Sequence, residues 1–140
     1  MNQEVQEAID EIAKQFPGHA LVVAGDPSGG AFVIVEEAPL GAPYAQETSW
    51  VGFQITHNCP YADTYPHFVR GDLTRADNGP LGEGMTNGHM FPQPGALANP
   101  SEMPPRSAIQ VSRRSNRRDS SGIETPNVKL LKVLQWMRSR

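Results

Sequence analysis

The only cysteine of the chain lies next to a histidine and an asparagine. These three residue types can form a catalytic site in which the cysteine is the nucleophile. Cys59 is the only cysteine in the 140 residues, and His57 and Asn58 precede it. A histidine can act as the base, an amide can stabilise an oxyanion, and a thiolate can attack a carbonyl. Pro60, however, predicts that a regular strand ends before it, so residues 57 and 59 need not point the same way. Cys59 and His57 are therefore candidate catalytic residues, and a small buried hydrophobe is the alternative interpretation of Cys59.

Histidines elsewhere allow two further chemistries. His89 lies in a stretch rich in Gly, Pro and Asn, where it is a candidate general base. His57, Cys59, His67 and His89 are potential zinc ligands, but their spacing matches no recurring zinc pattern. No glycine cluster has the spacing of a phosphate-binding loop. We therefore expect no metal site and no cofactor.

Four arginines lie close together near the end of the chain: Arg113, Arg114, Arg117 and Arg118. Residues 1–105 carry three basic and thirteen acidic side chains, whereas residues 106–140 carry nine basic and two acidic ones. A basic segment of this kind can attract an acidic partner, or it can pair with the acidic part of its own chain. Nucleic acid is not the expected partner, because no aromatic residues are interleaved and no nucleic-acid-binding motif is present. We expect the four arginines to form a docking surface for another protein.

Length and composition fit one small domain. The 140 residues are 38% hydrophobic, which is enough for a core and excludes general disorder. No stretch approaches the roughly 20 apolar residues of a membrane span, and the acidic, amphipathic start differs from a signal peptide. One cysteine also excludes an internal disulfide framework. We therefore expect a single domain over residues 1–140, in the cytoplasm and without contact to a membrane.

Apolar spacing predicts a helix at the start of the chain and strands after it. The helix has one apolar stripe that Pro17 and Gly18 end; the stripe consists of Val5, Ile9, Ile12 and Phe16. Four short segments rich in β-branched and aromatic residues follow, separated by turn residues; they are residues 19–24, 31–36, 49–56 and 67–73. We expect these four segments to form an antiparallel meander.

The second half of the chain begins with an unusual stretch. Residues 79–105 show neither a helical nor a strand period, which predicts a long irregular loop, and residues 107–112 are a candidate late strand. Thr125 as N-cap and Pro126 at the first helical position predict a closing helix. Its expected apolar face consists of Val128, Leu130, Leu131, Leu134 and Met137. The predicted fold class is α+β: an N-terminal helix, a four-stranded antiparallel meander sheet, a long irregular segment and a C-terminal helix.

The connector between the third and fourth expected strands carries a family resemblance. Its sequence, CPYADTYPHF over residues 59–68, resembles the YPxxPP-type turn of the ubiquitin-conjugating-enzyme (UBC) fold and its RWD relatives. Tyr61 and Pro66 stand at matching positions, and Tyr65 takes the place of a proline. Residues 68–81 look like the strand and turn that follow in prokaryotic members, and QVSRR at residues 110–114 is similar to a Q-W-S-R-H-type stretch in some of them.

The resemblance implies a UBC-like protein of a bacterial ubiquitin-like conjugation system, whose partners are an activating enzyme and a ubiquitin-like protein. Members of that family carry their cargo as a thioester on a cysteine beyond the fourth strand. Residues 79–105, where that cysteine is expected, contain none, which implies an atypical or non-catalytic member. The alternative is an RWD-type protein-interaction module without conjugating chemistry. A third interpretation is an unrelated small α+β enzyme that uses histidine and carboxylates of this loop.

Overall fold

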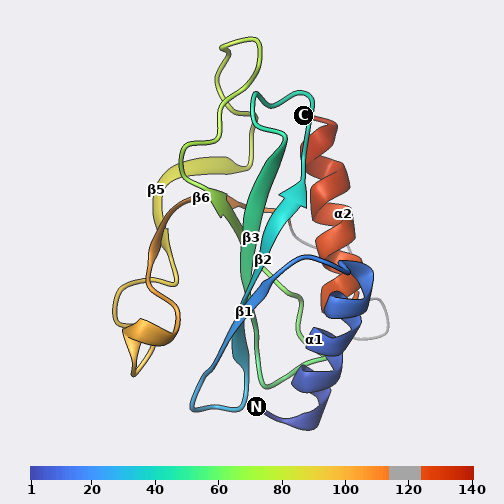
Figure 1. Ribbon diagram of the computed structural model, residues 1–140, viewed down its shortest axis with the longest axis vertical. Coiled ribbons are helices and arrows are strands. Elements are labelled where there is room, and N and C mark those ends of the chain that lie inside the picture. Colours follow the sequence, from blue (N-terminus) through green and yellow to red (C-terminus); the bar gives the residue numbers. More distant parts are fainter. Residues whose placement is uncertain (114–123) are drawn as a thin grey trace.

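The chain folds into one antiparallel sheet with both helices on the same side, as Figure 1 shows. The computed structural model describes residues 1–113 and 124–140. Within this part of the chain, six strands lie in the order β1-β2-β3-β4-β6-β5. The elements are α1 (Gln3–Gln15), β1 (Leu21–Gly25), β2 (Ala31–Pro39), β3 (Thr48–Ile55), β4 (His67–Arg70), β5 (Met85–Phe91), the short 3-10 helix η1 (Pro100–Glu102), β6 (Arg106–Val111) and α2 (Pro126–Arg138).

Helix α1 confirms the predicted N-terminal helix and begins at a capping residue. The side chain of Asn2 accepts a hydrogen bond of 2.9 Å from the backbone N–H of Val5, which satisfies one of the free donors of the first turn. Gly18 follows the helix with a φ of +82°, a conformation that suits glycine. The apolar stripe predicted from the sequence is buried against the sheet.

The four predicted strands form the expected meander. Strand β1 pairs with β2, β2 with β3, and β3 with β4, each pair antiparallel. In the turn before β2, the carboxylate of Asp26 accepts hydrogen bonds from the backbone N–H groups of Ser28 and Gly30. Near the end of β2 the register shifts between Val35 and Ala38, and Glu37 adopts a φ of +54° in this bulge.

The expected count of four strands is wrong, because the sheet continues beyond the meander. The candidate late strand is confirmed as β6, which pairs with β4, and β5 pairs with the outer side of β6. Strand β5 lies inside the stretch of residues 79–105 that was expected to be irregular. Among its residues only Met85 and Phe91 are buried, and its register shifts between Thr86 and His89. An edge strand with a bulge has no regular alternation, so the sequence pattern gave no strand signal there.

Helix α2 confirms the predicted cap but presents a different face to the core. The Thr125 hydroxyl accepts a hydrogen bond of 3.3 Å from the N–H of Val128. Leu130, Leu134 and Met137 are buried as expected, whereas Val128 and Leu131 are 41% and 37% exposed. The buried face instead includes Lys129 and Val133. A lysine within an apolar face is the feature that the hydrophobic pattern could not show.

The two faces of the sheet are covered by different parts of the chain. Alternate strand residues such as Val33, Phe53 and Ile109 form the larger core together with both helices. The opposite, open face carries a second cluster that includes Phe32, Phe68 and Phe91. Residues 92–105, which connect β5 to β6, lie against this face through two buried side chains, Leu97 and Met103. We call this segment the proline-rich flap. In the described residues, no helix is long and apolar enough to cross a membrane.

Replacing Leu134 with alanine tests whether α2 is part of the core. Leu134 is 1% exposed, so Leu134→Ala should lower the free energy of unfolding by about 2–5 kcal/mol through lost burial and a new cavity. Leu131→Ala, at the exposed position on the same helix, is the matched control and should cost under about 1 kcal/mol. Urea denaturation measures both values. Equal effects of the two substitutions would mean that α2 does not dock on the sheet as described.

Candidate functional site

Cys59 lies in the connector between β3 and β4 and faces α1. The residue is 8% exposed and belongs to the core on the helix side of the sheet. Its sulfur is 4.0 Å from the backbone oxygen of Glu4. Burial raises the pKa of the Cys59 thiol, and the negative charges of Glu4 and Glu11 raise it further. The protonated thiol is therefore the stable form at neutral pH, and this form is a poor nucleophile.

The two residues before Cys59 do not compensate for this environment. Together with Cys59 itself, Glu4, Tyr61 and Ala62, they line an open pocket of about 420 Å³. The side chain of His57 is exposed, and its backbone oxygen accepts a hydrogen bond from the Asn2 side chain. Among the described residues, no hydrogen bond joins the His57 ring to the thiol. The geometry provides neither an activated thiol nor a base aimed at it.

The structure separates His89 from this pocket. His89 lies on the edge strand β5, and its ring contacts Phe68 edge-to-face with 6.2 Å between the ring centroids. Phe68 belongs to the cluster on the open face, whereas Cys59 belongs to the core on the helix side. The sheet therefore stands between the two candidates, and they cannot act on one substrate as nucleophile and base.

The residues of the family turn have different environments. Tyr61 is 71% exposed, so it does not pin the connector onto the sheet as a packing residue would. Pro66 and the neighbouring Tyr65 are partly buried and line a crevice on the open face. The turn thus contributes to two surfaces, one on each side of the sheet.

Of the four candidate docking arginines, only Arg113 falls within the described residues; Arg114, Arg117 and Arg118 lie outside them. Arg113 follows β6 and is partly buried. It lines an open pocket of about 350 Å³ with residues of and just after α2, which are Lys132, Gln135, Trp136 and Ser139. The ring of Trp136 carries the Arg140 guanidinium at 4.0 Å from its centroid. Basic side chains therefore gather at the C-terminal part of α2 next to Arg113.

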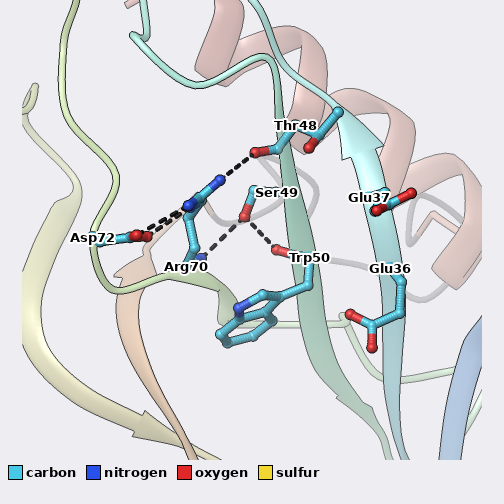
Figure 2. Close-up of a pocket in the computed structure, with 7 residues that line it drawn as sticks. All are labelled: Glu36, Glu37, Thr48, Ser49, Trp50, Arg70 and Asp72. Atoms are coloured by element: carbon cyan, nitrogen blue, oxygen red, sulfur yellow. Dashed lines mark hydrogen bonds and ion pairs between the residues drawn. The ribbon is translucent and has the colours of Figure 1, made fainter.

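A polar pocket that the sequence did not indicate lies where β2 bulges (Figure 2). Its volume is about 390 Å³, and its lining residues are Glu36, Glu37, Thr48, Ser49, Trp50, Arg70 and Asp72. Figure 2 shows Glu36 and Glu37 across the pocket from Arg70 and Asp72, with Trp50 between them. Within this lining, the Arg70–Asp72 ion pair joins residues close in the sequence, two positions apart, so it is the part of the pocket that the sequence could have indicated.

Three of the charged side chains in this pocket are already in ion pairs. Arg70 donates to both carboxylate oxygens of Asp72, at 2.6 and 2.9 Å. Arg106 binds Glu36 in the same two-pronged way, at 2.7 and 2.8 Å, and lies 5.3 Å from the Trp50 ring centroid. These hydrogen bonds lower the pKa of Asp72 and of Glu36, so both stay ionised at neutral pH. Neither carboxyl group is tuned for acid–base catalysis near pH 7.

A buried histidine lies between the sheet and α2 without hydrogen-bond partners. His67 is 0% exposed, and neither ring nitrogen has a partner among the described residues. Next to it, the fully buried amino group of Lys129 binds both carboxylate oxygens of Asp63 at 2.9 Å. Burial lowers the pKa of His67 to about 3, and the charges of Lys129 and Arg113 add to this against the opposing effect of Asp63.

No metal centre emerges from these residues. Within residues 1–113 and 124–140, no three side chains of His, Cys, Asp or Glu lie close enough together to hold an ion. The four potential zinc ligands named above are spread over both faces of the sheet.

Comparison of the chain with protein-family models, with curated proteins and with solved structures gives no match in any of the three. A functional hypothesis therefore rests on the geometry of the sites and on the resemblance in the connector between β3 and β4.

The neutral state of His67 predicts a specific loss of stability in acid. In the folded chain the pKa of His67 is about 3, below the usual 6.5. Between about pH 3 and pH 6.5, His67 is therefore protonated in the unfolded chain and neutral in the folded chain. The contribution of neutral His67 to the free energy of unfolding is therefore fully present above pH 6.5 and decreases as the pH falls below this value. From pH 7 to pH 4.5 the free energy of unfolding should decrease by about 2–3 kcal/mol through this group. Urea denaturation at a series of pH values measures the slope.

Two leucine variants separate this effect from other titrations. His67→Leu removes the buried imidazole and both unpartnered nitrogens, so it should flatten the profile between pH 7 and 4.5 and be at least as stable as the wild type at pH 4.5. His57→Leu, at an exposed histidine, should keep the wild-type slope. A His67→Leu profile that still falls as steeply as the wild type would rule out His67 as the cause.

Proposed function

We propose that this chain is a UBC-like protein of a bacterial ubiquitin-like conjugation system that binds partner proteins without carrying a thioester. The environment of Cys59 carries this proposal. The only thiol of the chain is 8% exposed, its pKa is raised, and it faces the carboxylates of α1. The segment after β4, where family members have their cysteine, contains none.

The chemistry of thioester exchange explains why this environment matters. Forming a thioester requires a thiolate, an accessible path to the sulfur and donors for the developing oxyanion. Glu4 and Glu11 disfavour the thiolate and would also repel an oxyanion. Cys59 borders an open pocket but is only 8% exposed, and its sulfur contacts the Glu4 backbone oxygen, so a protein cargo would have restricted access to it. Each of these conditions argues against transfer chemistry and leaves binding as the remaining role.

The arrangement of the elements supports the UBC-like part of the proposal. A helix precedes the four-stranded meander, and a helix follows the whole sheet and packs on the same face. Tyr61 and Pro66 occupy the connector between β3 and β4, as the resemblance requires. Partners in such a system are the activating enzyme and the ubiquitin-like protein. The basic surface around Arg113 and Lys132 is the contact that we assign to one of them, because an acidic partner surface would complement it.

A specific observation favours an RWD-type interaction module as the second candidate. Residues 79–105, in which a conjugating enzyme would hold its nucleophile, here form β5 and the proline-rich flap, and the flap covers the open face of the sheet. This segment therefore contributes to folding. In the second candidate the partner need not belong to a conjugation system, and the two functions differ in which proteins bind.

An adduct assay tests the absence of thioester chemistry. The purified chain is incubated with an activating enzyme from a neighbouring gene, its ubiquitin-like protein and ATP, and a reductant-sensitive adduct is sought by electrophoresis and mass spectrometry. We expect no adduct on the wild type. Calorimetry on the same proteins should detect non-covalent binding to the activating enzyme or to the ubiquitin-like protein, with equal affinity for Cys59→Ser. An adduct that Cys59→Ser abolishes would contradict the proposal, and the absence of any binding would favour the second candidate.

A charge reversal tests the docking surface. Arg117→Glu combined with Arg118→Glu should weaken the partner complex about tenfold or more at low salt, because complementary charges across the interface are lost. The melting temperature should stay nearly unchanged, because the proposal assigns these arginines to partner binding and not to folding. The control is Lys14→Glu with Gln3→Glu and Gln15→Glu, which changes the net charge equally at exposed positions of α1, away from the basic side chains of α2. Equal weakening by the two variants would indicate a general charge effect and no docking surface.

A further inference from the structure

The open face of the sheet carries a crevice with an uncharged lining. Its floor consists of two cross-strand pairs, Phe32 with Gln54 and Phe68 with Gln110. These pairs come from β2, β3, β4 and β6, which are consecutive in the sheet. Met90 and Phe91 of β5, Gln93 and Ala96 of the flap, and Tyr65 with Pro66 complete the lining. We call this the aromatic crevice.

Phe91 forms a fixed wall of the crevice because a glycine lets it lie on the sheet. Its ring stacks on Phe68 with 5.0 Å between the centroids and meets Phe32 edge-to-face at 6.1 Å. A Cβ atom added to Gly52 would lie only 2.5 Å from the Phe91 ring. Leu97 and Met103 anchor the flap behind this wall, and proline restricts its backbone. The crevice is therefore formed before any ligand binds, which lowers the entropic cost of binding.

The chemistry of the lining indicates what fits. None of the ten lining side chains is charged, and three of them are carboxamides. Gln54 donates to Asp26 at 3.3 Å and Gln110 donates to Ser112 at 3.1 Å, each through its Nε2 atom. Because a carboxylate can only accept, the bond to Asp26 fixes the orientation of the Gln54 amide. Within the described residues, no hydrogen bond engages the side-chain oxygens of Gln54 and Gln110, so these oxygens can accept from a ligand.

The size of the crevice fits one side chain of a bound peptide better than a whole cofactor. Its volume is about 280 Å³, just below the roughly 300–1,000 Å³ of pockets that enclose drug-sized ligands. This space suits one large apolar side chain with its adjoining peptide groups. Carboxamides match peptide groups, since both donate through N–H and accept through C=O. Met90 is 37% exposed, so an apolar thioether lies accessible beside the crevice.

We propose that the aromatic crevice binds an uncharged, extended segment of a partner protein and takes up one of its leucine or phenylalanine side chains between the floor and the flap. This inference rests on the proposed function as an interaction protein and names the chemistry of a second contact, separate from the basic surface on α2. The absence of charge in the lining selects against a charged anchor, because such a side chain would lose its hydration without gaining a counter-ion.

Short peptides and the isolated protein test the proposal. The probes are N-acetylated, C-amidated pentapeptides Gly-Gly-X-Gly-Gly, with X as Leu, Phe, Ala or Lys, and the readout is the set of side-chain amide signals of Gln54, Gln93 and Gln110 in ¹H–¹⁵N spectra. The Leu and Phe peptides should shift these signals saturably, with a dissociation constant of about 1 mM as expected for a single anchor. The Ala and Lys peptides should bind at least about tenfold more weakly.

Matched variants locate the binding. Ala96→Leu places a larger side chain in the crevice at an exposed position and should weaken the Leu peptide by about tenfold or more. Ala62→Leu, which makes the same change in the pocket beside Cys59, should leave its binding unchanged. Met90→Lys provides a second test, because it adds a charge beside the crevice, and should also weaken binding.

Three outcomes would overturn the proposal. They are the absence of saturable shifts with both the Leu and the Phe peptide, equal binding by the wild type and both crevice variants, and a preference for adenosine over the peptides, which would indicate a small planar ligand. The assay uses no activating enzyme and no ubiquitin-like protein. Its failure would therefore leave the adduct and calorimetry experiments on the proposed function unaffected, and their failure would leave this result standing.

Discussion

The pairing of β6 with β4 is the interaction on which the rest of the structure depends. Strand β4 is only four residues long, and all four pair with β6, from His67 opposite Val111 to Arg70 opposite Ala108. Because β6 pairs with β4, β5 lies at the edge of the sheet, on the outer side of β6. The flap that connects β5 to β6 therefore runs over the open face. The same pairing sets Arg113 beside α2 and brings Arg106 into contact with Glu36. A four-stranded sheet without β6 would have neither the aromatic crevice nor the ion pair that closes the polar pocket.

The two faces of the sheet then take on different physical roles. The helix side buries the larger core and also encloses polar groups: the thiol of Cys59, the imidazole of His67 and the ion pair of Lys129 with Asp63. Burial favours the neutral form of the first two groups and requires a counter-charge for the lysine. At neutral pH, Cys59 and His67 are therefore uncharged, and Lys129 is held in an ion pair. On the open face the phenylalanines are buried, whereas Tyr65, Met90 and the three glutamines of the crevice stay at least partly accessible to a ligand.

The electrostatic environment of Cys59 disfavours a nucleophilic thiolate. Carboxylates surround the thiol, whereas the basic side chains gather at the far end of α2. A nucleophilic cysteine needs positive potential, and here it meets the negative charges of Glu4 and Glu11. In the polar pocket, Glu36 pairs with Arg106 of another strand and Arg70 pairs with the nearby Asp72, so these three pocket charges already have counter-ions. These features support the proposal that the chain docks on partner proteins, by charge at α2 and by shape at the crevice.

Local patterns in the sequence were enough to predict the α1 stripe, the four meander strands, the late strand and the Thr125–Pro126 start of α2. These follow from periodicity, caps and turn residues, which act within a few positions. Strand β5, the buried face of α2 and the two pockets on the sheet depend on long-range packing that these patterns do not show. An edge strand such as Met85–Phe91 is held by its partner and not by its own pattern, and Lys129 is buried because Asp63, far along the chain, lies opposite it. Likewise, the sequence shows a cysteine at position 59, but only its burial and its proximity to Glu4 and Glu11 raise the pKa of its thiol. Contacts between residues distant in sequence leave no local signal, and burial, charge pairing and pocket shape all arise from such contacts.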